Sequence, residues 1–199
     1  MSRHVDYYFA PQSPWTYLGH ERFAQIVGAA RATLRVLPVD LGRIFPLSGG
    51  LPLGKRAPQR QAYRLVDLKR FSEQLKVPLN LHPRFFPVSG DDAARLITTV
   101  DLQDGTDAAM ALSGAVLGAV WAQERNIADA QVLAQLLAAC GLADTRLEEA
   151  RSPAIDALYQ AHTQEAIDAG VFGAPTYVVD GELFWGQDRL DFVQQRLHP

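Results

Sequence analysis

Two groups of residues that could do chemistry stand at opposite ends of the chain. The first is Ser13-Pro14-Trp15-Thr16, which begins a predicted amphipathic helix. Ser is a preferred N-cap and Pro fits the first helical position, so the hydroxyl of Ser13 would lie beside free backbone N–H groups at the positive end of the helix dipole. Such a place can stabilise a thiolate that belongs to another molecule. The simpler interpretation is that Ser13 only caps the helix.

The second group lies between Val171 and Arg189. A Gly and a Pro interrupt the chain there, and Thr176-Tyr177-Val178-Val179 follows as a β-branched and aromatic run. Asp180-Gly181 is a strong hairpin signal, Leu183-Phe184-Trp185 is the returning strand, and Gly186-Gln187-Asp188 opens a final amphipathic helix. The block predicts strand, turn, strand and helix after a proline. An ordinary surface hairpin is the alternative.

The elements that would position these groups follow from the first forty residues. Val5–Phe9 predicts a strand, apolar residues at helical spacing continue to about residue 30, and Leu34–Val39 predicts a second strand. Strand, helix, strand at the front and strand, strand, helix at the back is the order of a thioredoxin fold split by an insertion. We therefore expect an α/β thioredoxin-like domain from 1–40 and 171–199, with a helical insertion domain and connecting helix at 41–170.

The insertion shows apolar residues three or four apart in most of its length. Helices are expected near 58–76, 91–104, 107–125, 129–140 and 152–169. Within the segment Phe45–Ala57, the run Ser48–Gly54 is too rich in Gly and Pro for regular structure. This fits either a mobile loop that brings Lys55 and Arg56 to an active site or a plain surface loop. Arg60, Arg64, Lys69 and Arg70 are expected on an exposed helix face.

Composition excludes several function classes. The 199 residues carry a net charge of −3, which suggests no nucleic-acid or membrane-surface partner, and no run reaches the length of a membrane span. Cys140 is the chain's one cysteine, so a Cys-x-x-Cys dithiol is excluded and a reducing cytoplasm is expected. Cys140 ends an apolar helix and is assigned to the core. The five histidines lack metal-ligand spacing, so no metal is expected.

At these motifs the sequence resembles the 2-hydroxychromene-2-carboxylate isomerase family, which is grouped with kappa-class glutathione transferases among DsbA-like proteins. The shared pieces are Asp6–Phe9, Ser13-Pro14 with Tyr17-Leu18, Tyr63 with Asp67-Leu68, Phe86-Pro87-Val88, and Val171–Thr176 leading into Phe184–Leu190. They span nearly the whole chain in the family's order. The resemblance also implies a homodimer.

The resemblance implies a glutathione site built from both ends of the chain. Ser13 would hydrogen-bond the glutathione sulfur and keep it as the thiolate. Ala174, before a cis Pro175, would pair its backbone with the cysteinyl part. Trp185, Gly186, Gln187 and Asp188 would hold the γ-glutamyl end, with Asp188 on the ammonium group and the helix N-terminus on the carboxylate. Asp188 could instead simply stabilise the helix dipole.

The implied reaction is cis–trans isomerisation of an aromatic pyruvate. The glutathione thiolate adds to the unsaturated carbon, rotation follows about the new single bond, and the thiol leaves, so glutathione is a recycled cofactor. Lys55 and Arg56 are the candidates for binding the substrate carboxylate. The residues proposed for an aromatic wall are Phe45, Tyr63, Phe85 and Phe86.

The substrate region departs from the family pattern where the glutathione positions do not. Gly50 or Leu51 falls near the family's loop Asn, Phe45 stands where some members have a Lys, and Ser89 replaces an Asn. Two other functions therefore stay open. One is a transferase or peroxidase that consumes glutathione, and the other is a non-catalytic thioredoxin-like binding protein.

Overall fold

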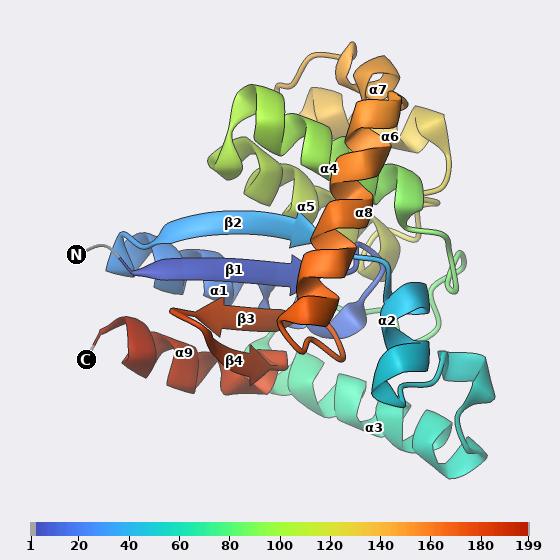
Figure 1. The fold of residues 1–199 in the computed structure, drawn as a ribbon. Helices are drawn as coiled ribbons and strands as arrows, with labels where there is room; N and C mark the ends of the chain where they lie inside the picture. The colour runs from blue at the N-terminus through green and yellow to red at the C-terminus, as the bar shows by residue number, and fades with distance from the viewer. Residues whose placement is uncertain (1–2, 199) are drawn as a thin grey trace.

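The computed structural model describes residues 3–198, which form a four-stranded mixed sheet flanked by helices (Figure 1). The strands are β1 (His4–Phe9), β2 (Thr33–Pro38), β3 (Thr176–Val179) and β4 (Glu182–Trp185), in the spatial order β2-β1-β3-β4. β2 runs parallel to β1, whereas β3 is antiparallel to both β1 and β4. This is the α/β thioredoxin-like architecture that the sequence predicts.

The register of the sheet brings the two ends of the chain together. Tyr8 is paired with Thr176, and Thr176 is paired with Trp185. The last residues of β1 and β4 and the first residue of β3 therefore lie at the same end of the sheet. The hairpin that sets this register turns at Asp180 and Gly181, whose φ angles of 48° and 85° are those of the tight turn predicted from the Asp-Gly pair.

The side chains of β1 alternate between two cores. Val5, Tyr7 and Phe9 face the larger core, which includes residues of α1 (Pro14–Ala30) and of the insertion. Tyr8 points to the other face and packs in a smaller core with Ala166 of α8 (Pro153–Asp168). α8 crosses that face of the sheet in Figure 1. β3, which lies inside the sheet, is buried at all four of its residues.

The insertion is helical, as the sequence predicts. Its helices are α2 (Leu41–Ser48), α3 (Pro58–Leu75), α4 (Asp91–Asp104), α5 (Thr106–Trp121), α6 (Ala130–Ala139), α7 (Arg146–Glu149) and α8. Asp129 and Ser152 are N-caps whose side chains accept hydrogen bonds from backbone N–H groups of α6 and α8. The chain ends in η2 (Gln187–Arg189), a 3₁₀ turn, and α9 (Leu190–Leu197).

Three local predictions were wrong. The run Ser48–Gly54 is not irregular throughout, because α2 ends at Ser48 and a 3₁₀ turn, η1, spans Leu53–Lys55. Asp40 caps α2 through the N–H of Gly42, and Ile44 anchors the helix in the smaller core, so capping and burial outweigh the nearby Gly and Pro residues. The predicted helix 107–125 stops at Trp121, and the four-residue α7 was not predicted.

No helix within residues 3–198 is long and apolar enough to cross a membrane. The expected domain limits fall at the Asp40 cap before α2 and just beyond the end of α8. They stay a prediction.

Candidate functional site

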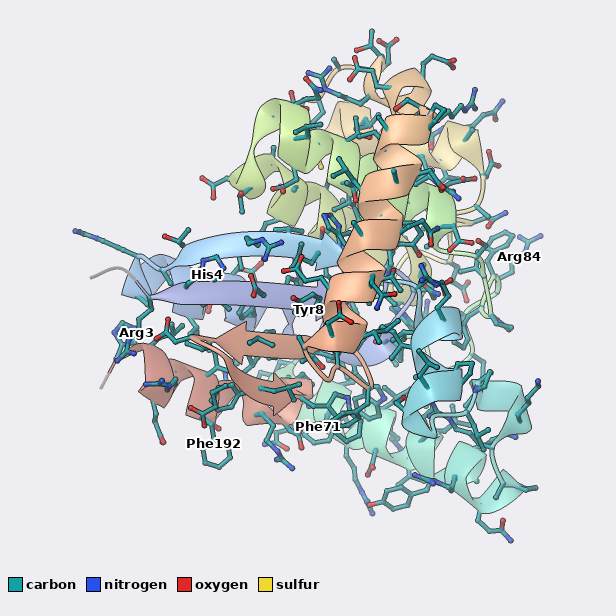
Figure 2. The ribbon with its side chains drawn as sticks, in the orientation of Figure 1. Arg3, His4, Tyr8, Phe71, Arg84 and Phe192 are labelled. Carbon is teal, nitrogen blue, oxygen red and sulfur yellow. The ribbon has the colours of Figure 1, made fainter. Side chains whose placement is uncertain are left out.

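The two predicted motifs lie close together at the end of the sheet where β1 and β4 terminate. A cavity of about 610 Å³ opens there, a size typical of small-molecule sites. Trp15 at the start of α1 forms one wall, Ala174 and the run Trp185–Arg189 form the second, and α3 forms the third. Figure 2 shows Phe71 of α3 on the β4 side of the molecule, and its ring packs edge-on against Trp15 with centroids 5.8 Å apart.

Ser13 caps α1 immediately beside this cavity. Its Oγ accepts a hydrogen bond of 3.2 Å from the N–H of Thr16, and the residue is 8% exposed. A serine hydroxyl can accept and donate at once, so the cap leaves its O–H proton free to point at a sulfur. Ser13 does not itself line the cavity, whereas Trp15, two residues later, does.

Ala174 and Pro175 form the turn that leads into β3. The peptide bond between them is cis, as the resemblance implies, and a second cis bond joins Phe86 to Pro87. Ala174 lines the cavity, and within residues 3–198 neither its N–H nor its carbonyl has a hydrogen-bond partner. A peptide group without a hydrogen-bond partner at the start of a strand can pair with the backbone of an extended ligand.

The run from Trp185 to Asp188 is fixed by close packing against glycines. A Cβ on Gly173 would overlap the indole of Trp185, and a Cβ on Gly19 of α1 would lie 2.6 Å from Cβ of Gln187. Trp185 is 50% exposed at the rim, and Asp188 makes an ion pair of 3.0 Å with Arg189. Gln187 is 3% exposed, and its Nε2 has no partner among the described residues.

These features fit the chemistry of glutathione. The tripeptide needs a donor to its thiolate, a backbone partner and groups for an amino acid at its γ-glutamyl end. The Ser13 hydroxyl and the unpaired Ala174 peptide would supply the first two of these beside one cavity, and the run Trp185–Asp188 would supply the third. The unpaired Nε2 of Gln187 is covered by protein atoms, so Gln187 lines the cavity with other atoms.

The third wall carries three arginines, here called the α3 cluster: Arg56, Arg60 and Arg64. Within the described residues Arg60 and Arg64 make no ion pair, and the guanidinium of Arg56 donates only to the carbonyl of Leu51, at 2.8 Å. Burial, followed by the charge of Arg56, lowers the pKa of Arg64 to about 10. The pKa of Arg56 is lowered by burial and by Arg60. The cavity therefore has a positive wall.

The predicted substrate residues divide between the cavity and its surroundings. Arg56 and Tyr63 line it, and Tyr63 is exposed at its rim. Lys55 and Phe45 do not line it: Lys55 is exposed in the 3₁₀ turn, while the ring of Phe45 lies 6.0 Å from the guanidinium of Arg56. Phe86 packs against Trp121, with ring centroids 4.8 Å apart, behind the cavity lining. The roles of these residues stay predictions.

The sequence patterns did not indicate most of the α3 wall. Of the four basic residues predicted on an exposed helix face, Arg60, Lys69 and Arg70 are exposed, whereas Arg64 is half-buried. Arg60 and Arg64 also line the cavity, which was not predicted. The other lining residues that were given no role in the site are Trp15, Gln59, Asp67, Phe71 and Arg189. A signal was present: residues 60 and 64, and residues 63, 67 and 71, are four apart and so share neighbouring rows of one helix.

A second cavity, of about 970 Å³, lies between α1 and α5 and is lined by none of the predicted site residues. At its wall His20 is buried between the hydroxyl of Tyr7 and the carbonyl of Met110, and burial lowers the pKa of its imidazole. Cys140 packs against the larger core, and burial raises the pKa of its thiol. No group of three potential metal ligands occurs in residues 3–198.

The fold and site together define a thioredoxin-like protein whose first helix begins with serine instead of a dithiol. A family model described as the DSBA-like thioredoxin domain matches residues 4–198, and the chain belongs to this family. It is 30% identical over 199 residues to a 2-hydroxychromene-2-carboxylate isomerase of Sphingobium xenophagum, covering 99% of both chains.

Two further comparisons agree. The chain is 25% identical over 209 residues to glutathione S-transferase kappa 1 of Homo sapiens, covering 99% of this chain and 92% of that one. A solved structure of a 2-hydroxychromene-2-carboxylate isomerase superposes with a TM-score of 0.77 at 26% identity, covering 98% of this chain and 94% of that one. The relatives therefore include isomerases and a glutathione transferase.

Proposed function

We propose that the protein is a glutathione-dependent isomerase that interconverts the cis and trans forms of an aromatic pyruvate or chromene carboxylate. The observation that carries the proposal is the meeting of Ser13, the unpaired peptide of Ala174 and the run Trp185–Asp188 beside one cavity. Full-length similarity to a 2-hydroxychromene-2-carboxylate isomerase supports the reaction type.

Bound glutathione would supply a thiol that can add reversibly to the unsaturated carbon of the substrate. The protein's part is to bind, orient and polarise. Ser13 donates its O–H to the sulfur, and the N-terminus of α1 adds the favourable field that lowers a thiol pKa. Ala174 aligns the cysteinyl backbone, while Gln187 and Asp188 hold the γ-glutamyl carboxylate and ammonium.

The aromatic side chains would control solvent at the reacting centre. Trp15 and Phe71 form an edge-on pair in the cavity lining, and Trp185 leans on Phe172 at its rim, with ring centroids 4.8 Å apart. A ring bound between them excludes water, which strengthens the interaction between thiolate and hydroxyl. Arg56 supplies positive charge for a carboxylate.

The test is an isomerisation assay with 2-hydroxybenzylidenepyruvate and the related chromene carboxylate, followed by chromatography. The proposal expects interconversion that requires reduced glutathione and leaves its amount unchanged at the end. Interconversion at the same rate without glutathione, or none with it, would overturn the proposal.

A kappa-type transferase is the second candidate, favoured by the relation to the human enzyme and by the changes at Phe45, Gly50 or Leu51, and Ser89. Transferase activity consumes glutathione, so mass spectrometry would show a stable conjugate. A peroxidase would instead leave oxidised glutathione.

The proposal also includes a homodimer and a cytoplasmic location, where glutathione is kept reduced. Both come from the family resemblance and from the single cysteine. Sedimentation measures the mass of the purified protein in solution and so distinguishes a monomer from a dimer. A monomer at micromolar concentration would remove the dimer from the proposal.

A further inference from the structure

The strongest unexplained feature of the cavity is the guanidinium of Arg64. It lies over two aromatic rings, 5.4 Å from the centroid of Phe86 and 5.7 Å from that of Trp121. Arg64 lines the cavity, yet within the described residues it makes no ion pair and no hydrogen bond. Removing a charge from water without an anionic partner is costly, so its position needs a reason other than stability.

Two other arginines of this chain differ from Arg64 because their guanidinium groups are neutralised by carboxylates. Arg95 also stacks on an aromatic ring, that of Tyr159, but it bonds Asp156 at 2.9 Å and Asp92 at 3.0 Å. Arg146 is held by two carboxylates, those of Asp104 and Glu149. Arg64 shares the stacking of Arg95 and lacks its anions.

The rings that hold Arg64 connect it to the reactive end of the cavity. Trp121 is fully buried, and its Nε1 donates a hydrogen bond of 3.2 Å to the carbonyl of Gln12, the residue before Ser13. The rings beneath the guanidinium therefore link α3 to the residue before Ser13. A guanidinium stacked on rings keeps its N–H groups available, and their planar arrangement suits a carboxylate.

The cavity has enough unneutralised positive charge to bind more than one anion. Asp188 is paired with Arg189 and Asp67 with Arg70, so the α3 cluster keeps three unneutralised cations. In the proposed function the γ-glutamyl carboxylate of glutathione is held at the start of η2, and the glycine carboxylate can neutralise one cation. At least one cation then remains for a second ligand.

We propose that Arg64 is a specificity-determining residue that binds the carboxylate of the aromatic substrate and so selects aromatic carboxylates over neutral electrophiles. This inference rests on the proposed function. It assigns the carboxylate to Arg64 on the inner wall, with Arg56 beside it, in place of Lys55, which does not line the cavity. In an aromatic pyruvate the carboxylate lies only a few bonds from the unsaturated carbon, which places that carbon near Ser13.

The test uses calorimetric titration of the full-length protein with benzoylformate and, separately, with its methyl ester and with reduced glutathione. Arg64→Met removes the charge and keeps an apolar chain between Phe86 and Trp121. Arg64→Lys keeps a charge without the fork. Arg84→Met is the matched control, because Arg84 also stacks on a phenyl ring, 5.2 Å from the centroid of Phe85, but does not line the cavity. Figure 2 shows Arg84 at the edge of the molecule.

We expect Arg64→Met to weaken benzoylformate binding by about 10- to 100-fold, the range for hydrogen bonds to a charged group. Arg64→Lys should fall between, Arg84→Met should match the wild type, and the ester should bind weakly and equally to all variants. Glutathione affinity should stay within about twofold throughout.

Three results would overturn the inference. One is equal benzoylformate affinity in Arg64→Met and wild type, and another is no saturable binding of benzoylformate to the wild type. The third is a parallel loss of glutathione affinity in Arg64→Met, which would assign the guanidinium to glutathione. Failure of the proposed function has a separate signature, because the wild type would then not bind glutathione, whatever the benzoylformate titration shows.

Discussion

Two groups of charged residues, one beneath α8 and one at the cavity wall, contrast in how they are neutralised. On the side covered by α8, Arg35 makes two hydrogen bonds to Glu165, of 2.5 and 2.7 Å, and one of 3.2 Å to Asp6. These three residues are here called the α8 cluster; Figure 2 shows Tyr8, their neighbour, on that side. The α3 cluster has no such carboxylate partners.

The difference separates charge that serves the fold from charge that serves a ligand. Arg35 ties β2 to α8 and β1, so its partners are part of the chain and its positive charge is balanced without any other molecule. Arg64 is more costly to keep, since burial lowers its pKa to about 10 and no anion compensates. Charged groups whose burial is energetically unfavourable and which line a cavity are typical of functional sites.

The largest expected effect comes from Ser13→Ala, compared with Ser152→Ala. Both serines are N-caps, one at the site and one on α8, and each accepts a backbone N–H. Each variant should lose about 1 kcal/mol of unfolding free energy. Turnover should fall about 100-fold or more only in Ser13→Ala, as for loss of one donor to a developing anion. Glutathione-dependent kinetics and urea unfolding measure both. Equal turnover in the two variants would remove Ser13 from the mechanism.

A smaller effect is expected from Gly19→Ala, with Gly28→Ala as control. Both glycines lie in α1, so each substitution improves helix propensity by a similar amount, about 1 kcal/mol. A Cβ at Gly19 would press on Gln187, at 2.6 Å, whereas a Cβ at Gly28 meets nothing within 4 Å. Glutathione affinity should fall about tenfold in Gly19→Ala, because one hydrogen bond is misplaced. Isothermal titration that shows the same affinity for both variants would contradict the assigned role of Gln187.

The two clusters should respond oppositely to loss of an arginine. Arg35→Met should lower the unfolding free energy by about 1 kcal/mol, a modest value because the side chains of Arg35 and Glu165 are 41% and 40% exposed. Arg64→Met should leave stability unchanged or raise it, because it removes a partly buried charge that has no partner. Thermal unfolding of both variants measures this. A clear loss of stability in Arg64→Met would show that Arg64 stabilises the fold. That result would contradict the contrast between the two clusters.

The smallest effect is a pH dependence that the α8 cluster contributes to stability. Arg35 holds the pKa of Glu165 below its usual value, so this carboxylate stabilises the fold above its unfolded pKa, about 4.3. That contribution is lost as the pH falls through the lowered folded pKa. Between about pH 5 and pH 3, wild-type stability should therefore fall more steeply than that of Arg35→Met. Parallel melting curves would contradict the assignment.

The sequence predicted the features that local patterns determine. The strands of Tyr7 and Tyr177, the cap at Ser13 and the Asp-Gly hairpin all follow from neighbouring residues. The family resemblance, borne out by the match over 4–198, joined the two ends of the chain into one fold.

The α3 wall was not predictable in the same way. Whether Arg64 faces solvent or a cavity depends on where α3 lies against α1, and its rings come from Phe86 and Trp121, far along the chain. Periodicity assigns a residue to a helix face but does not say what the face meets. For the same reason α2 was missed, because its anchor is the tertiary burial of Ile44.

The most direct test of the glutathione site is a calorimetric titration with reduced glutathione of wild type, Asp188→Ala and Asp191→Ala. Both acids stand at the start of the last helical segment, but Asp191 is paired with Arg22 and does not line the cavity. We predict saturable one-site binding to wild type and Asp191→Ala, and weaker binding to Asp188→Ala. No binding at millimolar glutathione, or equal affinity in all three proteins, would contradict the account.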